Sequence, residues 1–422
     1  MASVATSELG FPQRVLSVVH EVPDLGRTRS VPRAATTARD LGIEIVVCGL
    51  LQAGEQATAW RDLASRALER NPFYEPDFAL AAARHLREAP RPVFVFLWDV
   101  ARPRGTADAL LGVVPIVLPR FGFATLEVFG WRHDHAVLGV PLLDRDRAYP
   151  ALLAFFDWLA DAMPQAGGML FPSLPEDGPT AAVLRAVAAG EGRAVHRFDP
   201  HRRAVLQAGE SAETLLARAL KPKRLKEYAR QRRRLADGGG VSLESATDPT
   251  AIRDACEVFL TMEAAGWKGR NGTAFVQSAS GATFVRALTR DMARQGGCRI
   301  DLLRAGDVPV AAAIVLQAGD RAMYWKTTYD ERFAASSPGV QLTLELTRLQ
   351  LDQPQIAVTD SCAVADHPMI DALWPARAAM ADWLVTLRGR NSPSALAVTM
   401  REHARRGLRD TAKRIVRQVR PD

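Results

Sequence analysis

The sequence predicts an α/β protein made of two similar halves, each a mixed sheet flanked by helices. Three observations point to this class. Short strand-like runs alternate with amphipathic helical runs along the chain. The order of these runs between residues 43 and 199 recurs between residues 241 and 387, at an offset of about 190–205 residues. A strongly basic segment lies between the two series. We therefore expect two copies of one fold, joined by a basic helix.

The composition is that of a globular protein. The 422 residues are 48% hydrophobic and 24% charged, which excludes wholesale disorder. Every apolar stretch is shorter than the roughly 20 residues that a membrane-spanning helix requires. The four cysteines are scattered without a Cys-x-x-Cys pair, which argues against a zinc ribbon or a disulfide framework. We expect a cytoplasmic protein, with the inner face of the membrane as a further site of contact.

The first half begins after a tail. Residues 1–40 lack periodicity and predict a flexible segment, and an N-terminal domain is expected over residues 41–207. Runs rich in β-branched and aromatic residues predict its strands, and apolar residues every three to four positions predict its helices. The strands are expected at 43–51, 93–99, 110–118, 126–130, 169–171 and 194–199, and the helices at 54–70, 76–88, 147–163 and 179–190.

The second half repeats this order, and a C-terminal domain is expected over residues 241–390. Two short glycine-containing turns, at 305–307 and 318–320, predict a meander of three antiparallel strands. The strands are expected at 241–246, 299–304, 308–317, 321–328 and 356–360, and the helices at 249–266, 280–295, 338–352 and 375–387.

Positive charge is concentrated in two segments. Residues 218–234 carry nine Lys or Arg against one acidic residue, and residues 388–422 carry ten against three. Since the whole chain has a net charge of only +7, the remainder is mildly acidic. Two interpretations stay open: solvated amphipathic helices, or a basic surface for anionic lipid, nucleic acid or a phosphorylated substrate.

The basic segments are predicted to be helical. Within a linking region at 208–240, Ser211 caps a short helix, Pro222 interrupts it, and a second helix follows at 223–236 until three glycines end it. The residues that this second helix should turn inward are Leu225, Tyr228, Ala229 and Leu235. The last region, 391–422, predicts a helix with five apolar residues only partly covered: Leu396, Met400, Leu408, Ile415 and Val419.

Several runs of the second half carry a family resemblance. They are RLKEYARQRRRLADGGGVSLESATDP, FLTMEAAGWKGRNGTAF, the stretch from Asp301 to Leu349, and VTDSC. In these runs the chain resembles the GNAT-superfamily acyltransferases of the cellulose-biosynthesis (CelD/BcsL) type, most specifically at Gly266–Gly269 and Ser337–Gly339. The resemblance implies two tandem GNAT-like domains, distantly similar to the Fem peptidyltransferases. It also implies acetyl-CoA or another acyl-CoA as co-substrate.

An acyl-CoA transferase needs a clamp for the CoA pyrophosphate, and the start of the helix at Pro338 is the candidate. Proline suits the first helical turn, and Ser336 or Ser337 can cap it. The first-turn N–H groups would then be free to bind an anion. The alternative is a Ser-Pro-Gly turn that binds nothing, because the chain lacks the spaced glycines usual in GNAT proteins. The predicted cofactor-binding residues are Ser337, Gly339, Val340 and Gln341.

Glu263 is the strongest candidate for the general base. On the helix at 249–266 it falls in the middle of an apolar stripe that contains Ile252, Phe259 and Met262. A carboxylate in that position is costly unless it is paired or faces a cleft, and a carboxylate in a cleft can act as a base. The alternative is a structural ion pair with Lys268.

The other candidate residues lie close to the same predicted strands. Lys326 is expected on the strand face shared with Tyr324 and Thr328, where it would hold an anionic group or serve only as an edge lysine. Tyr329 ends that strand and would protonate the departing thiolate. Asp360 ends a buried run and would face the same cleft if the strands splay. The predicted catalytic residues are Glu263, Asp360 and Tyr329, and the predicted substrate-binding residues are Trp267, Lys268, Tyr324 and Lys326.

These residues favour an N- or O-acyltransferase without a metal, since His133 and His135 have no third ligand nearby in the sequence. The acceptor is expected to be a small molecule or a polysaccharide precursor, in exopolysaccharide, cellulose or cell-envelope synthesis. Basic helices are expected to touch an anionic membrane. Two alternatives remain: Fem-like transfer from aminoacyl-tRNA, with tRNA as the nucleic acid partner, or an inactive binding module of a polysaccharide assembly.

Overall fold

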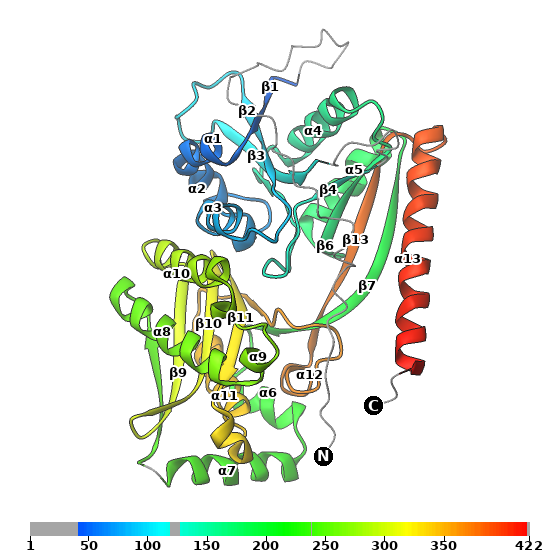
Figure 1. Ribbon diagram of the computed structural model, residues 1–422. Coiled ribbons are helices and arrows are strands. Elements are labelled where there is room, and N and C mark those ends of the chain that lie inside the picture. The colour runs from blue at the N-terminus through cyan, green and yellow to red at the C-terminus, as the bar shows by residue number, and fades with distance from the viewer. Residues whose placement is uncertain (1–40, 119–126, 238, 420–422) are drawn as a thin grey trace.

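The computed structural model describes residues 41–118, 127–237 and 239–419 (Figure 1). The tail expected at residues 1–40 lies outside these residues. Within them, no helix combines the length and the apolarity needed to cross a membrane.

The first half contains the expected elements and a few short additions. Its helices cover a sheet whose strands are rich in Val, Phe and Leu. In chain order these elements are β1 (Ile43–Cys48), α1 (Leu50–Glu55), α2 (Ala57–Ser65), η2 (Pro72–Tyr74), α3 (Pro76–His85), β2 (Val93–Asp99), β3 (Leu110–Val117), β4 (Glu127–Gly130), β5 (Leu142–Leu143), α4 (Ala148–Ala162), β6 (Gly168–Pro175), α5 (Pro179–Gly190) and β7 (Arg193–Gln207).

The second half follows two connecting helices and repeats the order, except that the stretch expected as a helix at 375–387 is a strand. The elements are α6 (Ala212–Ala219), α7 (Pro222–Ala236), β8 (Val241–Ala246), α8 (Pro249–Ala265), α9 (Trp267–Arg270), η3 (Phe275–Gln277), α10 (Ala279–Ala293), β9 (Cys298–Ala305), β10 (Val308–Ala318), β11 (Arg321–Tyr329), η4 (Glu331–Ser336), α11 (Pro338–Leu351), β12 (Val358–Asp360), α12 (Ile370–Leu373), β13 (Ala376–Gly389) and α13 (Pro393–Val419).

All the described strands form one mixed sheet. Its order is β1-β2-β3-β4-β6-β13-β7-β12-β11-β10-β9-β8, with β5 beside β3. Read inward from either edge, each half has three antiparallel pairings and then one parallel pairing, β4 with β6 or β11 with β12. The repeated order of elements expected from the sequence is thus confirmed.

The two halves exchange their last strands at the centre of the sheet. β7 leaves the first half and pairs with β12, whereas β13 returns to the first half and pairs with β6. The two exchanged strands also pair with each other, from Ala376 opposite Val205 to Gly389 opposite Arg193. The expectation of one sheet for each half is therefore wrong, because these long strands carry the hydrogen bonding from one half into the other (Figure 1).

The hydrophobic core also passes between the halves. Phe78 of α3 lies edge-to-face against Phe284 of α10, with ring centroids 5.6 Å apart, and against Trp325 of β11 at 5.8 Å. On the other face of the second half, Leu342 and Leu346 of α11 are buried in a separate cluster.

The basic helix α7 packs against η4 and β8 of the second half. Ser211 caps α6 by accepting a hydrogen bond from the Thr214 N–H at 3.2 Å, as predicted, and Pro222 is the first residue of α7. Leu235 is buried as expected, but Ala229 is exposed. In Figure 1, α7 lies at the end of the molecule far from the first half. The strands β7 and β13, rather than α7, hold the halves together.

The C-terminal helix α13 covers β13 through apolar and polar contacts, and its Val398 is buried in a cluster with Leu384 of β13. Arg406, buried at 5% exposure, lies 2.9 Å from an oxygen of Asp382 on β13 and also bonds Glu402, one turn earlier. The apolar residues of the opposite face are exposed as predicted for Leu396, Met400 and Leu408. The side chains of Ile415 and Val419 lie outside the described residues.

Candidate active site

An open strand edge is the main feature of the second half. β11 pairs with β12 in parallel over three positions, from Arg321 opposite Val358 to Met323 opposite Asp360. There β12 ends, while β11 runs on to Tyr329. The edge is open because β12 is much shorter than β11, and the splaying of the strands expected from the sequence stays a prediction. Beyond Met323 this side of β11 has no partner strand among the described residues. The Thr327 carbonyl already accepts a hydrogen bond from Lys268, and an extended ligand can pair with the other backbone groups of this edge.

A bulge in β11 decides which side chains face which helices. Ile314 of β10 lies opposite Lys326, but the next residue, Val315, lies opposite Tyr324, so Trp325 is an extra residue. The Tyr324 hydroxyl is 3.1 Å from the Thr343 hydroxyl on α11. The expectation that Lys326 shares a face with Tyr324 is therefore wrong, because the extra residue shifts the alternation of side chains by one position.

Lys326 instead lies on the side of α8 and α10. Its ammonium nitrogen is 5.4 Å from the ring centre of Trp325 and 5.6 Å from that of Phe275. The side chain is partly buried, and burial, followed by the nearby ammonium of Lys268, lowers the pKa of Lys326 to about 8. This environment disfavours the charged form of the amine.

Glu263 forms an ion pair with Lys268, which was the alternative role expected from the sequence. It is 2% exposed, and one carboxylate oxygen accepts a hydrogen bond from the Lys268 ammonium at 2.9 Å. The other oxygen accepts one from the backbone N–H of Phe275 at 2.8 Å. Lys268 also donates to the carbonyl of Thr327 on β11 at 3.1 Å. The pair therefore ties α8 and α9 to β11, and both carboxylate oxygens of Glu263 are engaged.

Asp360 is engaged as well. One of its oxygens accepts hydrogen bonds from Nε and Nη2 of Arg203 at 3.0 and 2.6 Å, and the other accepts from the Cys362 N–H at 2.9 Å. Both side chains of the pair are buried. Sequence reasoning missed Arg203, which is 157 positions away and approaches through the exchanged strand β7. The geometry thus favours a structural role for Asp360 over that of a base.

The start of α11 differs from the predicted clamp. Ser337 adopts a left-handed conformation (φ 50°, ψ 55°), and its side chain makes no capping hydrogen bond. The backbone N–H groups of Val340 and Gln341 donate to the Ser337 carbonyl at 2.9 and 3.1 Å. The Gln341 side chain donates to the carbonyl of Tyr228 on α7. The expectation of a serine cap is wrong, because the Ser337 side chain makes no such bond. The expectation of free N–H groups at Val340 and Gln341 is also wrong, because both already donate to the Ser337 carbonyl.

Gly339 remains the candidate anion contact of this helix start. Its N–H makes no hydrogen bond among the described residues. A Cβ placed on Gly339 would be 3.6 Å from the ring of Tyr329, so the end of β11 and the first turn of α11 lie side by side. The structure thus brings together two of the predicted residues, Tyr329 and Gly339.

A pocket of about 670 Å³ opens beside Tyr329. Its wall includes Met262 of α8, Arg270 of α9 and Glu331 of η4. Glu331 accepts hydrogen bonds from Arg270 at 2.7 Å and from the backbone N–H of Trp267 at 2.7 Å. The Trp267 side chain is 44% exposed. The pocket is large enough to hold part of a small substrate.

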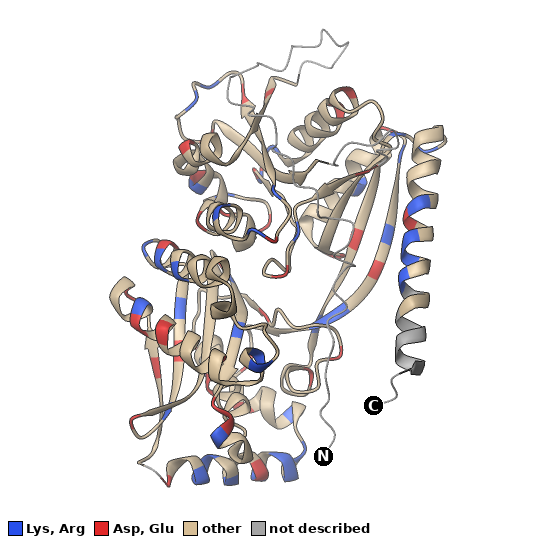
Figure 2. Cartoon of the chain, viewed as in Figure 1, with Lys and Arg blue, Asp and Glu red and all other residues tan. Residues whose placement is uncertain are grey.

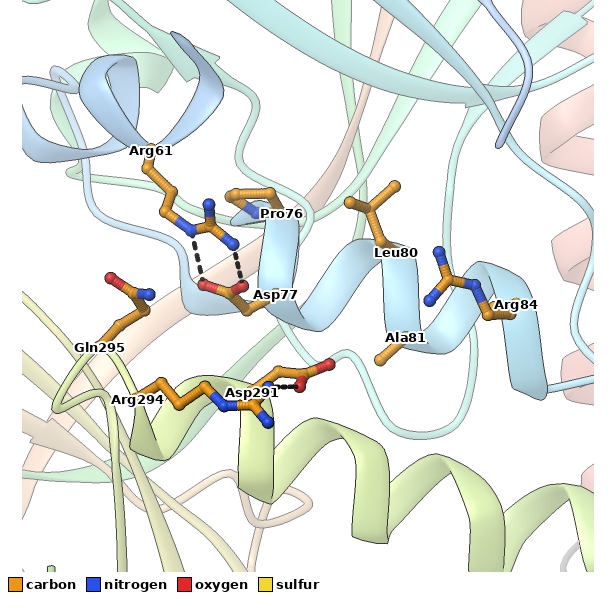
Figure 3. A pocket seen from close by; sticks show the side chains of 9 residues that line it. All are labelled: Arg61, Pro76, Asp77, Leu80, Ala81, Arg84, Asp291, Arg294 and Gln295. Atoms are coloured by element: carbon orange, nitrogen blue, oxygen red, sulfur yellow. Dashed lines mark hydrogen bonds and ion pairs between the residues drawn. The ribbon is translucent and has the colours of Figure 1, made fainter. Parts of the chain in front are cut away.

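A second pocket, of about 250 Å³, lies where α3 meets α10 (Figure 3). Four of the charged residues that line it form two pairs: Arg61 bonds Asp77 at 2.6 and 3.2 Å, and Arg294 bonds Asp291 at 2.8 Å. None of the residues predicted for the site lines it. This pocket marks the boundary between the halves.

The first half contributes a loop to the site. The indole N–H of Trp325 donates a hydrogen bond to the backbone carbonyl of His135 at 2.8 Å. The guanidinium of Arg203 donates one to the backbone carbonyl of Val137 at 2.9 Å. His133 Nε2 and His135 Nδ1 are buried without a hydrogen-bond partner among the described residues. Burial lowers the pKa of both imidazoles, that of His133 to about 3. Within those same residues, no group of three side chains is arranged to bind a metal.

Residues 222–357 match the family model described as an acetyltransferase (GNAT) domain. The match runs from α7 to the residue before β12 and includes the open edge of β11. Among solved structures, the crystal structure of FemX is similar, with a TM-score of 0.50 and 9% identity over 81% of this chain and 96% of that one. At this identity the similarity shows the fold alone.

Two further structures are similar over most of the chain. One is the C-terminal domain of a putative lysylphosphatidylglycerol synthetase from Agrobacterium fabrum, with a TM-score of 0.46 and 12% identity over 82% of this chain and 95% of that one. The other is a tandem GNAT protein from the clavulanic acid biosynthesis pathway, with a TM-score of 0.37 and 17% identity over 82% and 98%. No curated protein matches the sequence.

Proposed function

We propose that the chain is an acyltransferase that moves an acyl group from acyl-CoA to an amine or hydroxyl. The observation that carries this proposal is the open edge of β11, which lies inside the segment that matches the GNAT acetyltransferase domain. Such a reaction needs a bound and oriented thioester, and it needs a group to take a proton from the acceptor. No protein nucleophile is required.

The residues present fit an acyl-CoA. The unpaired backbone of β11 after Met323 would receive the amide groups of the pantetheine arm. The N–H of Gly339, at the positive end of α11, would contact the pyrophosphate. The Tyr329 hydroxyl would lie near the departing sulfur. Bound acyl-CoA supplies the activated carbonyl, and the chain holds it in place.

A carboxylate at position 339 tests this binding mode. Gly339→Asp places a negative charge where the pyrophosphate would lie, so acetyl-CoA should no longer raise the melting temperature. An acidic residue in the first turn of a helix is itself favourable by about 0.3–1 kcal/mol, so the variant should fold normally. Gly407→Asp, on the exposed side of α13 with nothing within 4 Å of the new Cβ, is the matched control. Equal stabilisation of both variants by acetyl-CoA would overturn the binding mode.

The acceptor that we propose is a sugar-containing precursor of an exopolysaccharide or of the cell envelope. This finer proposal rests on the sequence resemblance at Gly266–Gly269 and Ser337–Gly339. The test is release of CoA thiol from acetyl-CoA in the presence of amino sugars, neutral sugars and amino acids in turn. Release with amino acids and not with sugars would contradict the sugar acceptor.

A second candidate function is aminoacyl transfer from charged tRNA, and the exposed basic residues of α7 favour it. In Figure 2 much of the ribbon of this helix is blue, the colour of Lys and Arg. Binding through phosphates falls steeply with salt, so tRNA binding measured at low and at physiological salt tests this function. The same surface supports the proposal of contact with an anionic membrane, which sedimentation with phosphatidylglycerol vesicles tests. The cationic residues exposed on α7 are Lys223, Arg224, Lys226, Arg230, Arg233 and Arg234.

A further inference from the structure

We propose that Lys326 is the general base that takes the proton from the attacking acceptor. The inference rests on the proposed acyl transfer and names the residue that performs one step of it. Neither of the two carboxylates expected as bases is free to act as one. The two carboxylates that the sequence offers as bases, Glu263 and Asp360, are both held in buried ion pairs, with Lys268 and Arg203. Both oxygens of each carboxylate already accept hydrogen bonds from the protein, so neither carboxylate is free to bind the acceptor's proton.

Lys326 has the position that a base requires. It lies on β11 three residues beyond Met323, on the stretch that no longer pairs with β12. The bulge at Trp325 turns it toward α8 and α10, and the hydrogen bond from the Trp325 indole to His135 ties that bulge to the loop of the first half. An acceptor that approaches the open edge from this side meets the amine of Lys326.

The surroundings of Lys326 favour a neutral amine. Among the described residues no acidic side chain forms an ion pair with it. Cation–π attraction to the rings of Phe275 and Trp325, within 5.6 Å of Nζ, favours the ammonium, but burial and the nearby ammonium of Lys268 outweigh it and lower the pKa. Lys268 already has Glu263 as its partner. The titratable groups that face Lys326 come from several elements: Glu263 of α8, Lys268 of α9, His133, Asp134 and His135 of the loop after β4, and Cys362 after β12.

The chemistry balances without any further reactant. The acceptor nitrogen or oxygen bonds to the carbonyl carbon of the thioester, the carbon–sulfur bond breaks, and the sulfur leaves with the electron pair. The acceptor proton passes to the lone pair of Nζ, and the resulting ammonium then protonates the CoA thiolate. Lys326 is neutral again when the products leave. Because thiols ionise near pH 8.5 and the pKa of Lys326 is lowered to about 8, this return of the proton is nearly balanced in free energy.

The protonation of Lys326 can be measured without any acceptor. The chain has six lysines: Lys221, Lys223, Lys226, Lys268, Lys326 and Lys413. Trace acetic anhydride added to the folded protein across a pH series labels each neutral amine, and mass spectrometry of the peptides resolves all six. We expect the labelling of Lys326 to reach half its maximum near pH 8, well before the exposed lysines of α7. A profile for Lys326 that rises together with those lysines would overturn the proposal.

Two substitutions connect the amine to catalysis. Lys326→Arg keeps the positive charge but supplies no proton acceptor near neutral pH. Lys326→Met keeps an unbranched apolar side chain and removes the amine. In both variants kcat should fall by about 10²–10⁴, while acetyl-CoA still stabilises the fold. In the wild-type enzyme the rate should rise with pH up to about 8 and then level off. Lys221→Arg, at the exposed residue that precedes α7, is the matched control and should keep the full rate.

The variants also separate this inference from the proposed function. If Lys326 instead holds an anionic group of the acceptor, Lys326→Arg keeps the rate and only Lys326→Met raises KM, and the proposal is refuted. Failure of the wild-type protein to bind acetyl-CoA would refute the acyltransferase function itself. Acyl transfer by the wild type with an unchanged rate in Lys326→Arg would refute the role of Lys326 alone.

Discussion

Arg203 on β7 and Asp360 at the end of β12 form a buried ion pair, in which Nε and Nη2 of the guanidinium lie 3.0 and 2.6 Å from one carboxylate oxygen. The arginine reaches Asp360 because β7 leaves the first half of the chain and pairs beside β12. Its remaining Nη1 donates to the carbonyl of Val137. One side chain therefore joins both halves of the sequence next to the open edge of β11.

Arg203→Met should destabilise the protein by about 3–5 kcal/mol, because it leaves Asp360 buried without its partner. Urea unfolding measures the loss. The double variant Arg203→Met with Asp360→Asn should recover part of it, since no unpaired charge remains. Arg218→Met removes an exposed pair with Glu210 and should change stability by less than about 1 kcal/mol. A loss at Arg203 as small as that at Arg218 would contradict the structural role.

Glu263→Gln should weaken the fold more than it weakens catalysis. The substitution removes the charge that pairs with Lys268, and a buried, hydrogen-bonded ion pair that loses one member costs about 3–5 kcal/mol. The protein that remains folded should keep most of its turnover, because Lys326, not Glu263, takes the proton. Melting temperature and turnover are to be measured on one preparation. A stable variant with turnover reduced about 100-fold would restore Glu263 as the base.

Truncation should separate the roles of β13 and α13. Removal of residues 393–422 leaves β13 complete, so the sheet should survive. Removal from residue 376 onward deletes the strand that lies between β6 and β7, so both halves should lose their structure together. Circular dichroism and limited proteolysis compare the two fragments. A folded protein that ends at residue 375 would show that the exchange of strands is dispensable.

Glu127 should make the protein less stable as the pH rises. Burial raises the pKa of this carboxyl to about 7, and the neighbouring Glu402 adds to the effect. Since the folded state then holds the proton more tightly than the unfolded state, stability falls between about pH 4.5 and pH 7 and levels off above. Glu127→Gln should therefore raise stability at pH 8, by at most about 3 kcal/mol, and leave it nearly unchanged at pH 4.

The control for this pH dependence is Glu44→Gln, at an exposed residue of β1. The measurement is thermal unfolding of both variants and of the wild type at pH 4 and at pH 8. If Glu127→Gln lowers stability at pH 8, the carboxylate is ionised and stabilising in the folded protein, and the raised pKa is refuted.

Local patterns in the sequence predicted much of this molecule. The period of about 3.6 residues in α8 placed Glu263 inside an apolar stripe, and the structure buries it there. Proline and glycine located the ends of α7, and the repeated order of elements predicted the two matching halves of the sheet. The helical period and the proline and glycine positions depend on residues close together in the chain, so each can be recognised in one short segment. The repeated order of elements follows from comparing such segments along the chain.

The stretch 375–387 shows where local patterns fail. Its apolar residues fit a helix, but it forms β13, because the strand completes the pairing of both β6 and β7. A strand that is buried on both faces lacks the alternation of apolar and polar residues that marks an exposed one. Pairing across the sheet therefore decided its structure, against its local periodicity.

The tertiary structure alone decided the chemistry of the site. The extra residue Trp325 depends on pairing with β10 and on the hydrogen bond to His135 in the other half, and it moves Lys326 away from the face of Tyr324. Arg203 reaches Asp360 only through the exchanged strand. The sequence by itself determined most of the helices and strands, apart from β13, and it determined which charged residues fall among apolar ones. The pairing of Asp360 with Arg203 and the orientation of Lys326 depend instead on contacts between residues more than a hundred positions apart.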